Sequence, residues 1–245
     1  MVLVSLVAAT GGCGRSTLAA GLADALHRRG RAVLALDLDP ANALALHLGA
    51  TAAPERGIGH APDGDWPATA LSNSDGVRIL PFGTPPLPML LRFERELAER
   101  PGWLREQLGR LAVPDDTIVL VDTPRLPSVL ALHAASAADH VLVVVSAEPV
   151  AYATLDRVER LQAAKTRFVV NAFDPQRPLQ QDLLLLLRDR LGARLLQEVV
   201  HRDTAIADAQ ARNRALPVDA PYSQAAEDLQ QLCTRLLHRL GASAP

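Results

Sequence analysis

A glycine-rich segment near the start of the chain has residue types that could bind phosphate. Residues 9–17 read Ala-Thr-Gly-Gly-Cys-Gly-Arg-Ser-Thr and join an apolar stretch to a helical pattern. Glycines let backbone N–H groups converge on an anion, and the start of a helix adds a positive dipole end. Arg15 supplies a positive charge, and the Ser16 hydroxyl is suited to phosphate-associated Mg²⁺. The segment therefore predicts a cradle for nucleotide phosphates, against the plainer interpretation of a glycine-rich turn without a ligand.

Two acidic motifs follow predicted strands further along the chain. Residues 37–42 read Asp-Leu-Asp-Pro-Ala-Asn, and residues 122–125 read Asp-Thr-Pro-Arg. Ligands of parallel sheets bind at the carboxyl ends of the strands, so we expect these carboxylates beside the glycine-rich segment. Asp37 and Asp39 would then lie near Mg²⁺ and the terminal phosphate, where catalysis is positioning and electrostatics. The simpler interpretation of the first motif is an Asp-Pro turn with solvated carboxylates.

Short runs of Val, Leu and Ile alternate with longer helical patterns along the chain. The expected strands cover residues 2–8, 32–38, 77–81, 117–121, 140–146, 167–171 and 195–200. The expected helices cover residues 16–29, 87–111, 151–163, about 178–191 and 223–240. Alternation at this spacing predicts an α/β fold, with a doubly wound, mostly parallel sheet and helices on both faces. We expect a single domain over residues 1–245.

The composition agrees with that fold class and excludes others. Hydrophobic residues make up 49% of the 245 residues and aromatic residues only 3%, which suits aliphatic parallel strands better than a β-sandwich. A formal net charge of −2 gives no overall electrostatic case for nucleic acid or an anionic membrane. The two cysteines, Cys13 and Cys233, predict neither a disulfide framework nor a metal site. No apolar stretch is long enough to span a membrane, and we expect a cytoplasmic protein.

The glycine-rich segment resembles the deviant phosphate loop of the ParA/MinD family of P-loop ATPases, whose pattern is Lys-Gly-Gly-x-Gly-Lys-[Ser/Thr]. In that family the first lysine reaches across a dimer to the other subunit's nucleotide. Here Thr10 and Arg15 stand at the two lysine positions, and Lys165, the one lysine of the chain, is distant in sequence. Arginine keeps the charge and can bind phosphate through two N–H groups, but it is not equivalent to lysine. We therefore expect phosphate binding to persist and hydrolysis to be weak or absent.

The resemblance implies catalytic and metal-binding roles for the matching polar residues. Asp39 would orient the attacking water, and Arg15 would act on the phosphates, so these two are the candidate catalytic residues. Ser16, Asp37 and Asp122 would surround Mg²⁺, with Asp122 at the end of a strand that looks like the Walker B strand.

The resemblance also implies which residues hold ATP. Asn171 would read the adenine edge, because its amide offers both a donor and an acceptor. Pro217 precedes a segment that resembles the loop packed on the base. Cys13 occupies the variable position of the phosphate loop, where a small apolar filler is favoured over a redox sensor. The expected ATP-binding residues are Thr10, Gly11, Gly12, Cys13, Gly14, Arg15, Ser16, Thr17, Asn171 and Pro217.

Several segments match one branch of the family more closely. They are residues 80–83, the shortened acidic motif, residues 122–125, and residues 201–205, which read His-Arg-Asp-Thr-Ala. Together they look like the BcsQ (YhjQ) branch found in bacterial cellulose-synthase operons. This implies an ATP-bound homodimer that acts as a scaffold or regulator of cellulose biosynthesis and secretion. Its partners would be cytoplasmic parts of an inner-membrane cellulose synthase complex and small operon-encoded proteins, which would hold it peripherally at the membrane or the cell pole.

Two other functions stay open. A ParA-type ATPase that segregates DNA or cargo would need a basic surface, and acidic neighbours dilute the arginines of the second half, so nucleic acid is not the expected partner. Those arginines are Arg157, Arg160, Arg167, Arg177, Arg188, Arg190 and Arg194. A MinD-like, membrane-associated positioning ATPase would use an amphipathic last helix. The leucine stripe of residues 229–240 would fit that use, although packing of this helix on the sheet is the favoured explanation.

Overall fold

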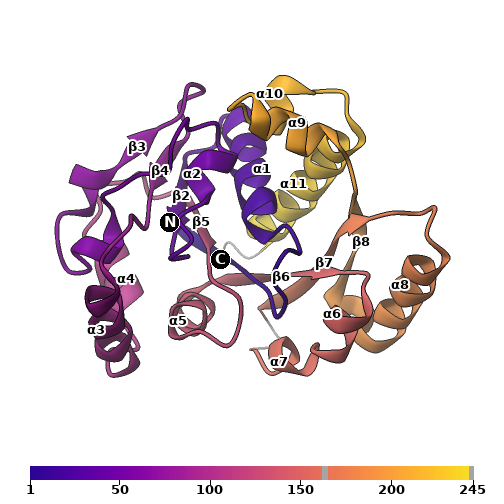
Figure 1. Cartoon of the computed structure of the whole chain (residues 1–245), viewed down its shortest axis with the longest axis horizontal. Helices are drawn as coiled ribbons and strands as arrows, with labels where there is room; N and C mark the ends of the chain where they lie inside the picture. The colour runs from indigo at the N-terminus through magenta and orange to yellow at the C-terminus, as the bar shows by residue number, and fades with distance from the viewer. Residues whose placement is uncertain (162–164, 243–245) are drawn as a thin grey trace.

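The computed structural model describes residues 1–161 and 165–242. Within them, eight strands form one sheet in the order β3-β4-β2-β5-β1-β6-β7-β8 (Figure 1). All neighbouring strands are parallel except the antiparallel pair β3 and β4. The predicted doubly wound, mostly parallel sheet is therefore confirmed. The strands are β1 (Val2–Val7), β2 (Val33–Asp37), β3 (Leu71–Ser72), β4 (Arg78–Leu80), β5 (Ile118–Asp122), β6 (His140–Ser146), β7 (Thr166–Phe173) and β8 (Leu195–His201).

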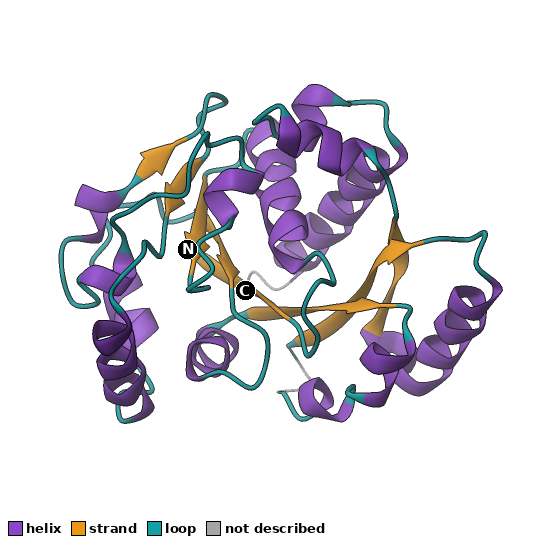
Figure 2. Cartoon of the chain, in the orientation of Figure 1, coloured by secondary structure: helices purple, strands orange, loops and turns teal. Residues whose placement is uncertain are grey.

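Helices cover both faces of the sheet, as predicted (Figure 2). One layer contains α1 (Arg15–Arg28), α2 (Leu44–His47), α9 (Ala205–Ala211), α10 (Leu216–Asp219) and α11 (Gln224–Ala242). The other contains α3 (Leu87–Ala98), α4 (Trp103–Gly109), α5 (Val129–Ala137), α6 (Pro149–Ala153), α7 (Asp156–Glu159) and α8 (Pro178–Leu191). The short 3₁₀ helices are η1 (Ile58–His60), η2 (Trp66–Thr69) and η3 (Gly192–Arg194).

Alternation along the buried strands builds a separate core on each face. In β1, Leu3 and Val7 pack into the core under α3, α4, α5 and α8. Val4 and Leu6 point the other way, into the core under α1 and α11. Successive strand side chains point to opposite faces, so a strand buried on both sides is apolar throughout. Burial on both sides explains the continuous Val and Leu runs. The two cores also hold the carboxyl ends of β1, β2 and β5 side by side.

The last helix packs inside the fold. Leu229, Leu232 and Leu236 of α11 are buried in the core shared with α1, and Leu237 and Leu240 pack partly buried against it. A Cβ added to Gly21 of α1 would lie 2.6 Å from Leu229 Cδ1, so the two helices approach closely. The favoured explanation of the leucine stripe, packing on the sheet, is confirmed. No helix in the described residues is long and apolar enough to cross a membrane.

The helix predictions were least accurate where the chain breaks a helix. The expected helix 87–111 is two helices, α3 and α4, separated at Pro101 and Gly102, because proline removes an N–H donor and glycine weakens a helix interior. The expected helix 151–163 is the short pair α6 and α7, and residues 162–164 lie outside the described residues. Sequence patterns also missed β3, α2, α5, α9 and α10. The α5 sequence is apolar nearly all round, so it carries no amphipathic signal.

Candidate functional site

The glycine-rich loop joins β1 to α1 at the carboxyl edge of the sheet. Gly12 and Gly14 have φ angles of 72° and 80°, in the left-handed region that glycine adopts without strain. A Cβ on Gly14 would lie only 2.2 Å from Asn171 Nδ2, so this position has no room for a side chain. Gly11 and Gly12 are exposed, and within the described residues no side chain caps the N-terminus of α1. The loop thus presents free backbone and a helix start to solvent, as a phosphate cradle requires.

Arg15 lies between two carboxylates at the base of this loop. Its Nε donates to Asp122 Oδ1 at 2.6 Å, and its Nη2 donates to Asp39 Oδ2 at 2.5 Å and to Ser16 Oγ at 3.3 Å. The Arg15 side chain is 10% exposed, and that of Asp122 is fully buried. Burial alone would lower the pKa of Arg15, but Asp122 and then Asp39 raise it. The Arg15 guanidinium therefore contacts Asp39, which was predicted to orient water, and also Asp122 and Ser16, which were predicted to bind Mg²⁺.

The carboxylate of Asp122 is only partly satisfied. Burial raises its pKa, and the contact with Arg15 opposes that rise. Its Oδ2 atom is buried and has no hydrogen-bond partner among the described residues. Unpaired buried oxygens are costly, and ordered water or an ion commonly satisfies them. Oδ2 of Asp122 is thus the oxygen in the site that is best placed to accept a metal ion or its water.

Asp37 anchors the first acidic motif from beneath. Its Oδ1 accepts the backbone N–H of Asp39 at 2.9 Å, and its Oδ2 accepts that of Leu44 at 3.0 Å. Asp37 also stands in register with Asp122 on the neighbouring strand. Burial, followed by the nearby Asp122 carboxylate, raises the pKa of Asp37 to about 8. Asp37 therefore holds the turn in shape, while its place near the metal stays a prediction.

Asn42 connects two motifs that are distant in sequence. Its side chain is buried, donates to the Pro54 carbonyl at 2.6 Å, and accepts the N–H of Gly83 at 3.1 Å. Its φ angle of 52° places it in the left-handed region, which asparagine tolerates better than most residues. The acidic motif is thereby tied by hydrogen bonds to the segment of residues 80–83.

Asn171 contacts the loop directly. Its Nδ2 donates to the Cys13 carbonyl at 2.7 Å, and the residue is 6% exposed. It lies within β7, which continues to Phe173, rather than at the strand end expected from the sequence. Pro217 is buried in α10, beside α1. The roles of both residues at an adenine base stay predictions.

Two residues near the loop were missed by the sequence assignments. His47 Nδ1 lies 3.5 Å from Thr17 Oγ1 and also contacts Gln210, so the Thr17 hydroxyl faces α2 and α9. Burial and then Arg15 lower the pKa of His47. Arg125 is exposed, and its Cδ lies 3.9 Å from the position of a Cβ on Gly11. The position of Arg125 three residues after Asp122 was the available signal for a cation at the loop.

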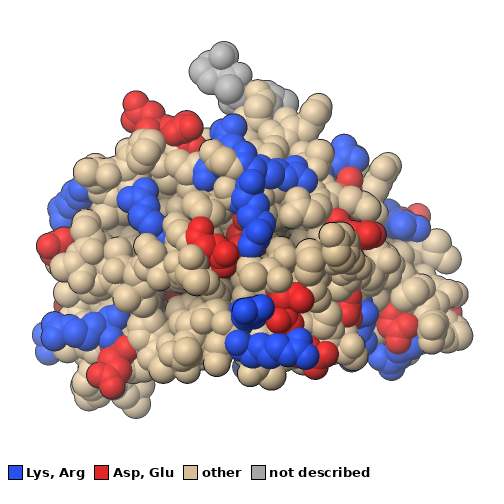
Figure 3. Space-filling model, turned by 90° about the horizontal axis from the view of Figure 1, so that it is seen from above, with Lys and Arg blue, Asp and Glu red and all other residues tan. Residues whose placement is uncertain are grey.

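The cysteines and several arginines of the second half are buried or paired within the protein. Cys13 and Cys233 are buried free thiols, and burial raises the pKa of both. Several of the arginines are in ion pairs: Arg177 with Glu148, Arg190 with Asp156 and Glu159, and Arg194 with Glu159. On the face shown in Figure 3, both signs of charge are interspersed among uncharged residues. This face does not carry the uniform basic surface typical of nucleic-acid binding.

Comparison with known proteins places this geometry in a family. Residues 1–237 match the family model described as "Cellulose biosynthesis protein BcsQ". The chain is 29% identical to the cellulose biosynthesis protein BcsQ of Salmonella typhimurium, over 98% of this chain and 96% of that protein. It is 31% identical to the chromosome-partitioning ATPase Soj of Thermus thermophilus, over 97% and 96% of the two chains.

A solved structure supports the fold. The septum site-determining protein MinD of Pyrococcus horikoshii, complexed with Mg-ADP, superposes with a TM-score of 0.78 at 22% identity, over 99% of this chain and 98% of that chain. At this identity the likeness is one of fold. With a family match over residues 1–237 and a 31% identical relative along nearly its whole length, the chain belongs to the BcsQ family and has the ParA/MinD-type P-loop ATPase fold.

Proposed function

We propose that this chain binds ATP, forms a homodimer with ATP at the interface, and acts as a scaffold or regulator of bacterial cellulose biosynthesis and secretion, with weak or absent hydrolysis. The family match supports the pathway. The observation that carries the mechanism is the contact of Arg15 with both Asp39 and Asp122. The proposed location is the cytoplasm, with peripheral attachment to the inner membrane through partner proteins.

In the structure, Arg15 is neutralised by the carboxylates of Asp39 and Asp122. The phosphates of ATP compete for the same guanidinium, because arginine binds phosphate and carboxylate through the same paired N–H groups. When Arg15 turns to the phosphates, Asp39 is released. Because Asp39 belongs to the turn held by Asp37 and Asn42, its release changes the surface beside the nucleotide. A partner can detect that change, which is how a bound nucleotide would act as a signal without turnover.

The residues present fit a magnesium ion that takes most of its ligands from phosphates and water, as Mg²⁺ usually does. Asp122, through its unpaired Oδ2, and the Ser16 hydroxyl would hold it, with Asp37 behind them. Within the described residues, no three His, Cys, Asp or Glu side chains could hold a metal by themselves. When bound, the ion would neutralise charge on the phosphate oxygens.

Weak hydrolysis follows from the same contacts. Asp39 can orient an attacking water only when its carboxylate is free, and the neighbouring Arg15 guanidinium competes with that water for the carboxylate. A lysine carries a compact charge on a flexible stem and would leave Asp39 unpaired more easily. Thr10 also removes the cation that would reach a partner subunit. The dimer would therefore persist with its nucleotide rather than cycle.

The proposal is tested by measuring mass and turnover on the same samples. We expect light scattering to show a monomer without nucleotide and a dimer with ATP and Mg²⁺, with phosphate release near background. Arg15→Lys should keep ATP binding and raise the hydrolysis rate. A chain that stays monomeric with saturating ATP would overturn the dimer proposal. Unchanged hydrolysis in Arg15→Lys would overturn the explanation of weak turnover.

The match to Soj supports a second candidate, a DNA- or cargo-segregating ATPase. The paired arginines of the second half weigh against a DNA surface there. A gel shift of the ATP-loaded chain on random duplex DNA separates the two functions. Strong binding that falls steeply with salt would favour segregation, and no shift would favour the cellulose scaffold. Vesicle flotation with and without ATP tests the MinD-like membrane alternative.

A further inference from the structure

The open edge of the sheet at β8 is a feature that nucleotide binding does not explain. Among the described residues β8 pairs with β7 alone, so its outer edge ends the sheet. The opposite edge is β3, which has only two residues. Short edge strands prevent unwanted pairing, whereas a seven-residue edge strand can offer backbone N–H and C=O groups to another chain. At the far end of β8 one such group is already used, because the His201 N–H donates to Asp228 Oδ2. β8 is therefore the edge where an added strand has the most room.

A pocket of about 330 Å³ lies along the first residues of this edge. It is lined by residues of η3, by Leu195, Leu196 and Gln197, and by arginines on both sides. Because β8 runs parallel to β1, its first residues lie at the amino edge of the sheet, away from the glycine-rich loop. The pocket is thus a separate site.

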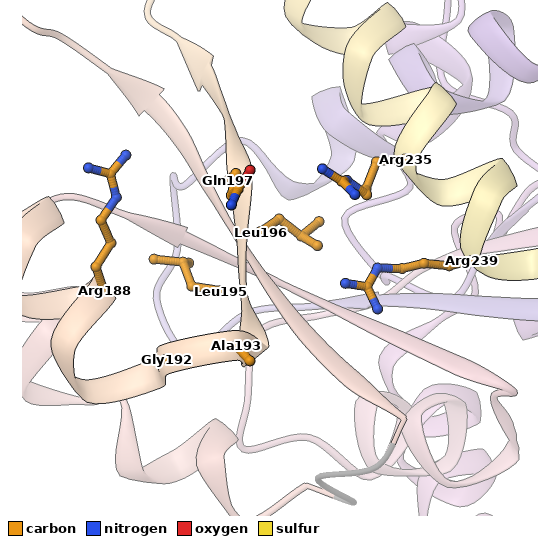
Figure 4. A pocket seen from close by; sticks show the side chains of 8 residues that line it. All are labelled: Arg188, Gly192, Ala193, Leu195, Leu196, Gln197, Arg235 and Arg239. Carbon is orange, nitrogen blue, oxygen red and sulfur yellow. The ribbon is translucent and has the colours of Figure 1, made fainter. Parts of the chain in front are cut away.

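Arginines flank the edge strand from both faces of the sheet. Arg188 extends from the end of α8 on one side, and Arg235 and Arg239 extend from α11 on the other (Figure 4). No acidic residue is among the described residues that line the pocket. Glu198 compensates part of the charge, since Arg235 Nε donates to it at 2.8 Å. Burial, followed by the charges of Arg167 and Arg235, lowers the pKa of Arg239, as expected where positive charges are crowded.

Leu195 and Leu196 point to opposite sides of β8, the first toward Arg188 and the second toward α11 (Figure 4). An added strand would repeat this alternation, so its successive side chains would meet the two arginine groups in turn. Its backbone would supply affinity and its acidic side chains specificity, which is the usual division of labour in strand addition.

We propose that the β8 edge binds an extended acidic segment of a partner protein as an additional strand. The occupant is not a second copy of this chain, because β8 paired with β8 would bring the two arginine groups together. It is not a duplex nucleic acid, because the arginines line a recess at a strand edge rather than a broad surface. Arginines lie on both faces of the sheet beside β8, so the complementary ligand is a peptide strand whose acidic side chains alternate between the two faces.

The probe is an acetylated, fluorescently labelled peptide of Val and Thr with Glu at every third position. This spacing sends successive glutamates to opposite faces of a strand. We expect micromolar binding by fluorescence anisotropy, independent of ATP. Arg188→Gln combined with Arg239→Gln should weaken binding at least tenfold, while the exposed Arg92→Gln on α3 should change it less than twofold. A peptide with Gln in place of Glu should bind at least tenfold more weakly.

Amide hydrogen exchange locates the peptide without relying on a variant. We expect added peptide to slow exchange within β8 and leave the glycine-rich loop unchanged. Equal binding of the Gln peptide, or binding without protection of β8, would overturn the proposal. So would tighter binding of random duplex DNA to the same arginines, or self-association through β8 that Arg188→Glu strengthens. If the double variant does not fold, the single variant Arg188→Gln replaces it in the binding measurement, because Arg188 is exposed and its replacement should not disturb the fold.

Discussion

Arginine appears in two contrasting environments at opposite edges of the sheet. At the carboxyl edge, Arg15 is nearly buried and meets the two carboxylates of Asp39 and Asp122. At the amino end of β8, Arg188, Arg235 and Arg239 line an open pocket, and Glu198 pairs with one of them. In the first environment carboxylates hold the guanidinium directly, and in the second no acidic residue is among the described residues that line the pocket.

The difference concerns what a ligand must do at each place. At the loop, an anion has to displace carboxylates that already hold the guanidinium, so binding is coupled to a rearrangement of the acidic motif. At β8, an anion meets charges that are in place, so binding requires little movement. The loop is therefore suited to switching and the edge strand to attachment. The variants below separate these two behaviours.

The largest expected effect is the loss of ATP binding at the glycine-rich loop while peptide binding at the β8 edge is kept. Gly14→Val should reduce ATP affinity more than about 100-fold, because a Cβ at Gly14 would lie 2.2 Å from Asn171 Nδ2 at a positive φ. Acidic-peptide binding at β8 should be unchanged. Calorimetric titration of ATP measures the first effect and anisotropy the second. Gly109→Val is the matched control, since a Cβ there meets nothing within 4 Å. Retained ATP affinity in Gly14→Val would show that ATP binds elsewhere.

The second effect compares the arginines by their contribution to folding. Arg15→Ala should lower the free energy of unfolding by about 3 kcal/mol, because it leaves the buried Asp122 carboxylate without its cation. Arg188→Ala, at an exposed position, should change it by less than about 0.5 kcal/mol. Urea denaturation measures both, and Arg15→Lys should recover part of the loss. Similar changes in the free energy of unfolding for Arg15→Ala and Arg188→Ala would contradict the proposed difference between the paired Arg15 and the exposed Arg188.

A third effect is a pH dependence that originates at Asp37, beside the loop. The pKa of Asp37 is about 8 in the folded chain and about 3.9 in an unfolded one. Between these values the folded chain keeps a proton that the unfolded chain releases, so the free energy of unfolding falls as pH rises from about 4 to 8. Asp37→Asn should flatten that slope in urea titrations at several pH values. The exposed Asp65→Asn is the matched control for the loss of a carboxylate, and parallel slopes for all three chains would contradict the assignment.

Local patterns in the sequence were sufficient for every strand of the sheet except the two-residue edge strand β3, and for the loop. Val and Leu runs located the main strands because parallel strands are buried on both faces, and glycine spacing located the phosphate cradle because left-handed backbone needs glycine. α5 escaped because an apolar sequence carries no periodicity. The break between α3 and α4 was readable in principle from Pro101 and Gly102, but the apolar pattern continued across it.

The charge pairing within the site lay beyond the sequence. Arg15 and Asp122 are 107 residues apart, and Asn171 and Cys13 are 158 apart. Sequence motifs indicated that these residues meet at one edge but not which atoms pair. The same limit hid the β8 pocket, because Arg188 and Arg239 come from different helices and only the sheet order shows that β8 is an edge.

The smallest expected effect concerns Arg125, an exposed arginine beside the glycine-rich loop. Its replacement tests whether a third arginine environment contributes to ATP binding. Arg125 lies next to Gly11 and can add one positive charge where Thr10 adds none. At an exposed position such a charge contributes about 1 kcal/mol at most. Arg125→Ala should therefore weaken ATP binding about three- to fivefold at low salt and leave the unfolding free energy unchanged.

Salt distinguishes this contribution from that of Arg15. Exposed charges are screened at high ionic strength, whereas buried pairs are screened much less. The Arg125→Ala effect on ATP titrations should disappear near 1 M salt, while the effect of Arg15→Ala should persist, with Arg92→Ala as the control for a general change in net charge. If Arg125→Ala has no effect on ATP binding even at low salt, Arg15 alone supplies the cation that this lysine-free loop offers to phosphate. The proposed switch then depends only on the exchange of the Arg15 guanidinium between carboxylates and phosphates.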